Sequence, residues 1–332
     1  MKIWYDACTG KQVRYGAAIA KRLEEKGHEI IFTTRKHPDT IPLAKHLGLK
    51  FEVVGKYDAK TRFTRLYESL KRQIKFSKMF HETPPDCAIC HASVDLCRVA
   101  FGLGIPIIYT FDTPHADVVN RLTLPLASVI VASKAIPAEV IRSYGAKNIV
   151  QFDGVDEVAW MKDFNPSMNF NFERPVIVVR QSEIKATYAE GKNDIMRIIA
   201  EKLTSLGHVI YLARYSRSRI KGLLIPKVFV DSASLAAQAD LVVSAGGTIS
   251  REAALAGTPS IIVDIFGRIH VNDYLASKGF PIFTVKPEGV TKTAREYLGK
   301  RFDVKSLLSD LENPVDVIEN IVYSLEAKGK AF

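Results

Sequence analysis

Several features that would classify a protein at once are missing from this sequence. No apolar run approaches the ~18 residues that a membrane-spanning helix needs, and Pro259–Phe266 is typical of the longest. Four cysteines in 332 residues are too few for a disulfide framework, which favours a reducing compartment. The first residues, MKIWYDACTG, enter a strand-like stretch without a basic and then apolar leader. We therefore expect a cytoplasmic protein that is neither secreted nor membrane-spanning.

Positive charge is in excess and is unevenly distributed. The chain has 46 Lys and Arg residues against 36 Asp and Glu residues, a formal net charge of +10. Half of this excess lies between Lys56 and Glu82, a segment with eight basic and three acidic residues. Such a surplus favours anionic partners, namely nucleotides, phosphorylated substrates or an anionic membrane surface. We expect no nucleic acid partner, because no zinc finger, aromatic-interleaved basic motif or RNA-binding signature is present.

Strand-like and helix-like segments alternate along the whole chain. Short apolar runs, such as Ile105–Phe111 and Lys227–Val230, are typical of parallel strands buried between helices. The alternation stops at residues 153–172, which include a glycine, a proline and three asparagines. At ~150 residues per domain, we predict two Rossmann-like, doubly wound parallel-sheet domains, 1–160 and 161–312. Because ligands bind at the carboxyl ends of such strands, we expect the site in a cleft between the two sheets.

The most informative segment is Leu241–Glu252 (LVVSAGGTISRE), in which a strand runs through two glycines into a helix. Glycines let the backbone approach a ligand, and the first N–H groups of a helix form a phosphate site. Gly246, Gly247 and Thr248 are therefore candidates for binding a diphosphate, and Glu252 for accepting hydrogen bonds from a ribose diol. The alternative is an ordinary βα turn in which Thr248 caps the helix. Spacing alone does not decide, because the sequence lacks both the P-loop and the full GxGxxG fingerprint.

Polar residues that follow strands in the N-terminal half are candidates for catalysis, because such residues face the ligand site. Asp112 and His115 follow one strand, and Asp117 comes soon after, so a general base is plausible there. His91 ends another strand, although a single histidine is more often structural. Asp is also common in turns and caps, which is the structural alternative for this segment.

Basic and polar residues near the same turns are candidates for holding phosphate or the acceptor. In the N-terminal half they are Gly10, Lys11, Asn120 and Arg121. In the C-terminal half, Arg180 and Arg214 are candidates for binding the nucleotide sugar. Plain α/β connections and solvated loops are the alternative interpretation of these positions.

The segment Cys87–His91 (CAICH) matches the pattern that attaches haem. We reject this role, because the segment reads as a buried strand in which cysteines pack as small apolar groups. A zinc site would need a second pair of ligands at suitable spacing, and Cys8 and Cys97 do not supply one. We predict no metal.

The helix-like segment Lys60–Phe80 combines an apolar stripe with basic residues around it. The stripe consists of Phe63, Leu66, Tyr67, Leu70 and Ile74. We interpret it as a core stripe beneath a solvated basic face. The alternative is docking onto anionic lipid, to which each basic residue would contribute ~1 kcal/mol.

Several runs of residues together resemble a known family. They are Lys11–Val13, Gly27–Ile30, Thr33–Arg35, Asn120–Pro125 (NRLTLP) and, most specific, Gly246–Pro259 (GGTISREAALAGTP). Through these runs the chain resembles, over essentially its whole length, the family called domain of unknown function 354. That family is similar to GT-B glycosyltransferases and to non-hydrolysing UDP-N-acetylglucosamine 2-epimerases. The resemblance implies two Rossmann-like domains around a nucleotide-sugar cleft.

The resemblance also assigns roles to residues. In GT-B enzymes that build lipid-linked peptidoglycan precursor, a glycine-rich loop holds the nucleotide diphosphate and a helix Glu holds the ribose. Gly246–Thr248 and Glu252 match those positions, and Asn272 resembles a residue that contacts the sugar or closes the site. The resemblance further implies no metal or other cofactor, membrane docking through residues 60–80, and a last helix, 313–332, that packs back on the N-terminal domain.

The sequence departs from both types of enzyme. The GGTGGH loop of the transferases is reduced to Thr9–Lys11, so its histidine is missing. The epimerases carry an acidic pair before Asn-Arg, of which only Asp117 is present. Their His-Arg-Arg-Glu-Asn motif is replaced by Arg180–Glu183 (RQSE), which makes the epimerase the weaker option.

We therefore predict a GT-B-type glycosyltransferase that uses a nucleotide sugar, UDP-linked by expectation, with a lipid-linked or other polyanionic acceptor. Asp112 is the first candidate for the general base, ahead of His91 and His115. A sugar-nucleotide epimerase and a non-catalytic nucleotide-sugar-binding protein are the alternatives. The sequence predicts no oligomeric state.

Overall fold

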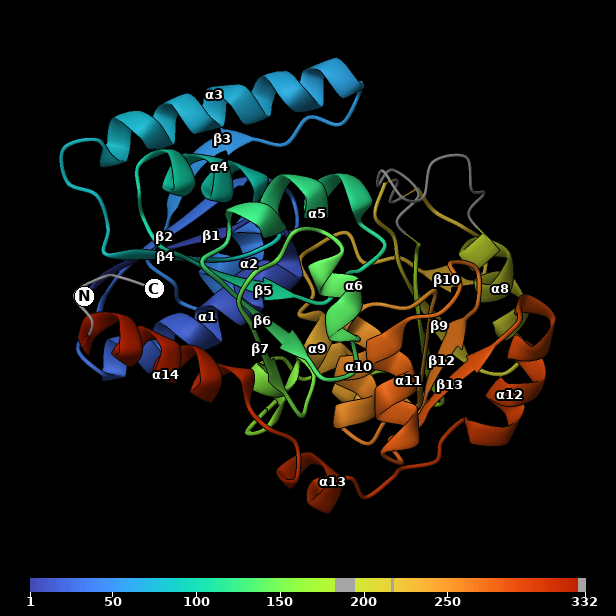
Figure 1. Cartoon of the computed structure of the whole chain (residues 1–332). Coiled ribbons are helices and arrows are strands. Elements are labelled where there is room, and N and C mark those ends of the chain that lie inside the picture. Colours follow the sequence, from blue (N-terminus) through green and yellow to red (C-terminus); the bar gives the residue numbers. More distant parts are fainter. Residues whose placement is uncertain (183–194, 216–217, 328–332) are drawn as a thin grey trace. The chain divides into compact units, whose positions relative to one another are not determined.

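The computed structural model describes residues 1–182, 195–215 and 218–327 (Figure 1). These residues form two compact units. Unit 1 comprises Met1–Trp160 and the C-terminal segment that begins at Glu312, and unit 2 comprises Met161–Leu311. Each unit has one parallel sheet with alternating helices, which confirms the predicted fold class of two Rossmann-like α/β domains. Glu183 and the end of the predicted last helix, 328–332, lie outside the described residues.

Unit 1 is built on a seven-stranded sheet in the order β3-β2-β1-β4-β5-β6-β7. The strands are β1 (Lys2–Ala7), β2 (Glu29–Lys36), β3 (Glu52–Lys56), β4 (Cys87–His91), β5 (Ile107–Phe111), β6 (Val129–Ser133) and β7 (Ile149–Phe152). Every residue of β4, β5 and β6 is buried, as expected for parallel strands covered on both faces. The strand order reverses between β1 and β4, and at such a switch point the loops that follow neighbouring strands open a ligand site.

The helices of unit 1 cover both faces of this sheet, with α1 and α14 on one face and α3 and α4 on the other (Figure 1). They are α1 (Gly10–Glu25), α2 (Ile41–His46), α3 (Arg62–Phe80), α4 (Val94–Gly102), α5 (Asp117–Thr123), the 3-10 helix η1 (Leu124–Leu126), α6 (Ala138–Arg142) and α14 (Pro314–Ala327). The short helix α7 (Val158–Met161) leads out of the unit. α14 packs against α1, where Arg22 donates hydrogen bonds to Asp316 at 2.6 Å and to Glu319 at 2.8 Å.

The interpretation of the α3 apolar stripe as core is wrong. The buried residues of the helix recur every four positions and are Glu68, Arg72, Phe76 and Phe80. Phe76 and Phe80 pack on Trp4 of β1, with ring centroids 4.7 and 4.5 Å apart from that of the tryptophan. Arg72 is 1% exposed and pairs with Asp6 and Asp95. These contacts turn the helix so that its apolar stripe faces outward.

Unit 2 has a six-stranded sheet in the order β10-β9-β8-β11-β12-β13. The strands are β8 (Val176–Arg180), β9 (His208–Leu212), β10 (Leu223–Leu224), β11 (Leu241–Ser244), β12 (Ser260–Val263) and β13 (Ile282–Val285). The helices are α8 (Ile195–Leu203), α9 (Ser232–Gln238), α10 (Thr248–Leu255), α11 (His270–Ser277), η2 (Pro287–Gly289), α12 (Val290–Tyr297) and α13 (Lys305–Ser309). Apolar clusters lie on both faces of the sheet.

The prediction of a strand at Lys227–Val230 in unit 2 is wrong. The described edge strand is β10, whose Leu223 pairs with Val209 of β9, and residues 227–230 form no regular element. Val228 is 73% exposed, so the apolar residues of this run do not pair into the sheet. Among the described helices of the two units, none is both long and apolar enough to cross a membrane.

Candidate active site

The carboxyl ends of the strands in unit 1 bring together a cluster of charged side chains, which we call the charged cluster. It consists of Lys11, His91, Asp112, Asp156 and Glu157. Lys11 lies in the first turn of α1, directly after β1, whereas His91 ends β4. Asp112 follows β5, and the other two acids follow β7. Residues from four separate segments therefore meet at one edge of the sheet, because all its strands run parallel.

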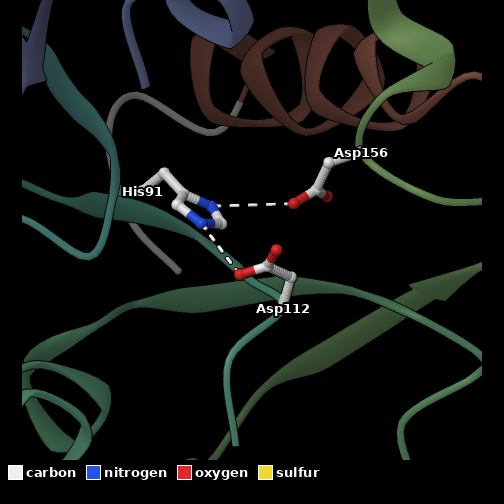
Figure 2. Close-up of side chains that lie close together, drawn as sticks. All are labelled: His91, Asp112 and Asp156. Atoms are coloured by element: carbon white, nitrogen blue, oxygen red, sulfur yellow. Dashed lines mark hydrogen bonds and ion pairs between the residues drawn. The ribbon is translucent and has the colours of Figure 1, made fainter. Parts of the chain in front are cut away.

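His91 is held between a hydroxyl and a carboxylate. Its Nδ1 lies 2.8 Å from Thr110 Oγ1, and its Nε2 lies 3.0 Å from Asp112 Oδ1. Asp156 Oδ2 lies 3.8 Å from Nδ1, so both carboxylates approach the imidazole (Figure 2). The histidine is buried, and the ring of Tyr15 lies 6.1 Å from it between centroids. These contacts fix the orientation of the ring.

Lys11 links the carboxylates of the cluster. Its Nζ donates to Asp112 and, at 2.8 Å, to Asp156, and it lies 3.6 Å from Glu157. Asp156 and Glu157 are almost completely buried, whereas 9% of the Asp112 side chain is exposed. Asp112 is therefore the carboxylate of the cluster that an incoming molecule reaches first.

The spacing of the cluster also fits a cation. One ligand atom each from His91, Asp112 and Asp156 lies within 4.8 Å of the others. The Lys11 ammonium already contacts both carboxylates, so positive charge is present where a divalent ion would bind. A cation held by these three residues would therefore compete with the Lys11 ammonium for both carboxylates.

Burial raises the pKa of the Asp156 carboxyl, and Asp112 and Glu157 act in the same direction, while Lys11 and His91 oppose the shift. Because the pKa of Asp156 is raised by folding, protonation of this carboxyl stabilises the folded state. The contribution of Asp156 to stability is then fully present below its ordinary pKa of 3.8 and is lost as the pH rises through the folded-state pKa.

Asp156→Asn, which cannot ionise, should therefore raise the melting temperature at neutral pH, with a gain that shrinks as the pH falls toward 3.8. Thermal unfolding followed by tryptophan fluorescence over this pH range checks the expectation. The exposed Glu139 changed to Gln is the control and should show no such trend. A variant less stable than the parent at neutral pH would mean that the Lys11–Asp156 pair outweighs burial.

The loop after Asp112 holds the remaining candidates of unit 1. Thr113 Oγ1 donates to Asp112 Oδ1 at 2.5 Å, and the buried Asn120 donates to the carbonyls of Thr113 and Pro114, both at 3.1 Å. Asn120 thus supports the loop that carries Asp112.

The other polar candidates of this loop face solvent. His115 is exposed, and Asp117 and Arg121 form an exposed ion pair at 2.9 Å. Gly10, the last candidate of the unit, begins α1 one residue before Lys11. The structure therefore brings Lys11, His91 and Asp112 together and leaves His115, Asp117 and Arg121 at the surface.

Asp156 and Glu157 were missed from the sequence, because they lie in a segment that reads as a linker and β7 before them was not predicted. β7 is an edge strand, and its residues are partly exposed, so its apolar sequence signal is weak. A recognised β7 would have placed the two acids at the same edge as His91 and Asp112.

In unit 2 the two glycines of the βα turn adopt backbone conformations that favour glycine. Gly246 has φ +96° and Gly247 has φ +122°. A side chain at Gly246 would collide with Ile269, whereas the space around Gly247 is open. Gly247, not Thr248, is the N-cap of α10, and no side chain caps this helix end. Ser244 accepts a hydrogen bond from Gly246 N at 3.0 Å and contacts Ser250 at 2.7 Å, which secures the turn.

A buried polar group lies behind this turn. Arg251, Glu252 and Asn272 are at most 3% exposed, and Arg251 donates to Asn272 Oδ1 at 3.1 Å. Asn272 Nδ2 has no hydrogen-bond partner among the described residues. It would lie 3.5 Å from a Cβ at Gly246, so this amide points at the turn.

Beside Asn272 lies a cavity of about 210 Å³. Its lining residues are Ile262, Asp264, Gly267, Arg268, Ile269, Asn272, Asp273 and Thr284. The buried amide therefore meets both the glycine turn and a hollow at the carboxyl ends of β12 and β13.

The two arginine candidates lie at the ends of neighbouring strands, where β8 and β9 pair. Arg180 is half-buried at the end of β8. Arg214 follows β9, is exposed, and donates from Nε to the carbonyl of Gln181 at 3.0 Å. Both stand at the carboxyl edge of the sheet, the edge from which the Gly246–Thr248 turn also projects.

Comparison with known proteins gives relatives of two kinds. An uncharacterised protein of Methanocaldococcus jannaschii is 29% identical over 96% of both chains. A UDP-GlcNAc 2-epimerase of the same organism, solved with UDP-GlcNAc and UDP, superposes with a TM-score of 0.74 at 14% identity, covering 97% of this chain and 100% of that one. A glycosyltransferase of Streptomyces sp. SF2575, complexed with thymidine diphosphate, superposes with a TM-score of 0.61 at 17% identity. This match covers 97% of this chain and 99% of that one.

These similarities show that the fold is GT-B-like, as predicted. Over residues 1–327 the sequence also matches a family described as a protein of unknown function (DUF354), and the chain belongs to that family.

Proposed function

We propose that this protein is a glycosyltransferase that transfers a sugar from a nucleotide diphosphate donor to an anionic acceptor, without a metal ion. The observation that carries the proposal is the charged cluster, in which Asp112, with 9% of its side chain exposed, is the most accessible carboxylate of an Asp–His–Lys arrangement. A general base for a hydroxyl acceptor needs a carboxylate or imidazole that the substrate reaches and that its neighbours hold in place.

In this reaction Asp112 takes the proton of the acceptor hydroxyl as the hydroxyl oxygen bonds to the anomeric carbon. The bond between that carbon and the diphosphate oxygen breaks, and the diphosphate leaves with the electron pair. His91, 3.0 Å from Asp112, orients the carboxylate and is placed to share the proton. Lys11 balances the negative charge of the buried acids.

The donor diphosphate binds unit 2 at Gly246–Thr248 in this proposal. The N-terminal end of α10 presents backbone N–H groups there, and a helix N-terminus attracts a leaving diphosphate. Glu252 binds the ribose and Asn272 the sugar, while Arg180 and Arg214 supply positive charge. Solved structures with the same fold hold UDP or thymidine diphosphate, which supports a nucleotide ligand.

The acceptor that we propose is a lipid-linked or other polyanionic molecule. The support is electrostatic, since the chain carries a formal net charge of +10 and half of it lies in one segment of unit 1. A positive surface concentrates such acceptors and speeds their encounter with the enzyme.

Glu252→Ala should weaken UDP binding by about tenfold or more, because a charge-assisted hydrogen bond contributes ~1.5–3 kcal/mol. Isothermal titration with UDP measures the loss, and the melting temperature of the variant shows that it is folded. The matched control is Glu288→Ala, which removes an exposed carboxylate of the same unit. Equal UDP affinity in parent and Glu252→Ala would contradict the ribose assignment.

The function itself is tested by incubating the full chain with a panel of nucleotide sugars, with and without acceptors. Thermal shift first identifies the donor, since a ligand at a hundred times its Kd adds ~2.7 kcal/mol of stability. Transfer of the sugar, or slow donor hydrolysis, supports the proposal.

An epimerase is the second candidate, and the higher TM-score of the epimerase neighbour favours it. It would convert the donor to an isomer with no acceptor present. Tight UDP binding without transfer, hydrolysis or isomerisation would instead indicate a nucleotide-sugar-binding protein.

A further inference from the structure

The outer face of α3 is an exposed apolar stripe. Its five large residues are Phe63, Leu66, Tyr67, Leu70 and Ile74, each between 47% and 72% exposed. They follow helical spacing and, at 1.5 Å per residue, extend over ~16 Å. Single exposed apolar residues are ordinary on a protein surface, but a row of five on one helix marks an interaction site.

The stripe cannot turn into the core of unit 1. The opposite face of α3 is fixed by Arg72, whose guanidinium lies 2.5 Å from Asp6 and 2.9 Å from Asp95. Phe76 and Phe80 are fixed on the same side by an edge-to-face and a tilted ring contact with Trp4. Rotation of the helix would bury the stripe only by breaking two buried ion pairs, so the apolar face stays outside.

The charges beside the stripe have one sign. Arg62, Lys71, Lys75 and Lys78 are exposed along the helix. Glu68 is the one acidic residue of α3, and it is buried and paired with Lys71 at 3.3 Å. The exposed face therefore combines apolar and basic groups without an exposed acid.

We propose that α3 docks unit 1 onto an anionic lipid surface, with the stripe inserted at the boundary of headgroups and acyl chains and the basic residues on lipid phosphates. A helix with one apolar face and basic flanks lies in a membrane interface in this way. A second copy of the chain fits this face poorly, because it would bring basic residues against basic residues. The proposal goes beyond the proposed function and does not depend on it.

The test is co-sedimentation of the full chain with vesicles of phosphatidylcholine alone or mixed with phosphatidylglycerol. The parent should bind the mixed vesicles and not the neutral ones. Replacing Lys71, Lys75 and Lys78 together by Gln should weaken binding roughly 100-fold, at ~1 kcal/mol per basic residue. The stripe variant, Leu66→Gln with Leu70→Gln, should weaken it at least about tenfold, because two large apolar side chains no longer insert.

Two control variants carry matched changes on unit 2. Lys286, Lys292 and Lys300, all exposed, are replaced by Gln to give the same net charge as the first variant. Ile198→Gln with Val228→Gln removes two exposed apolar residues elsewhere. Both controls should bind mixed vesicles as the parent does.

Three results would overturn the proposal. One is absence of binding to mixed vesicles, which would leave the face to an acidic protein partner. The second is equal loss in the α3 variants and their controls. The third is a parent that sediments as a dimer and a stripe variant that sediments as a monomer, which would make the face an interface between copies.

Discussion

Arg72→Met should lower the free energy of unfolding of unit 1 by about 3–5 kcal/mol, the cost of leaving a buried charge without its partner. Arg72 is 1% exposed and donates to both oxygens of Asp6, at 2.5 and 3.0 Å, and to Asp95 at 2.9 Å. It also donates to the carbonyl of Val54 at 2.6 Å. Methionine fills similar volume but removes the positive charge that neutralises the buried carboxylates of Asp6 and Asp95, and the donor to the carbonyl of Val54.

Denaturant unfolding followed by tryptophan fluorescence measures this effect in unit 1, because both tryptophans, Trp4 and Trp160, belong to it. Arg22→Met is the matched control. Arg22 also pairs with two carboxylates, but its side chain is 34% exposed, so the loss should stay below ~1 kcal/mol. An equal loss of unfolding free energy in the two variants would mean that burial of the Arg72 ion pairs adds nothing to their contribution to stability.

The same network predicts acid sensitivity. Burial alone would raise the pKa of Asp6, but the charge of Arg72 and hydrogen bonds from Arg72, Ser93 and Thr33 lower it overall. A carboxyl with a lowered pKa stabilises the fold above its ordinary value of 3.8, and this stability is lost as the pH falls through the folded-state pKa. In Arg72→Met the loss of stability that comes from protonation of Asp6 should disappear from the acid transition, because the charge that lowers the pKa of Asp6 is gone.

Asp112→Asn should lower kcat for sugar transfer by about 10²–10⁴-fold, the usual contribution of a general base. Asparagine keeps the size of the side chain and can still contact His91 and Thr113, but it accepts no proton. UDP affinity should be unchanged, since the proposal places the nucleotide on unit 2. Steady-state kinetics with the donor found by the panel, together with UDP titration, separates the two effects.

Glu139→Gln, which removes an exposed carboxylate of the same unit, should leave kcat unchanged. Asp117→Asn is the informative second variant, because Asp117 is exposed and pairs with Arg121, which is not part of the charged cluster. Loss of kcat in Asp117→Asn with normal turnover in Asp112→Asn would move the base to Asp117.

Local sequence patterns predicted the fold class. Buried parallel strands need continuous apolar runs and helices need a 3.6-residue period, and both signals are complete within short segments such as Ile107–Phe111. The strand, two glycines and helix of Leu241–Glu252 are equally local, and the positive φ angles of both glycines explain their use. The prediction missed the edge strand β7, because this strand is short and partly exposed. It also wrongly placed a strand at 227–230, where an apolar run does not enter the sheet.

Local sequence patterns were thus enough to predict two parallel-sheet domains, the glycine turn of unit 2 and the positions of His91 and Asp112 at strand ends. Which charged side chains contact one another became visible in the folded chain alone. Lys11 and Asp156 are 145 positions apart, and their contact follows from strand order, which no local pattern encodes. The direction of α3 was decided in the same way, since Asp6 and Asp95 draw Arg72 inward and leave the more apolar face to solvent. Amphipathic spacing shows that a helix has two faces, but the residues of neighbouring elements that contact the helix determine which face is buried.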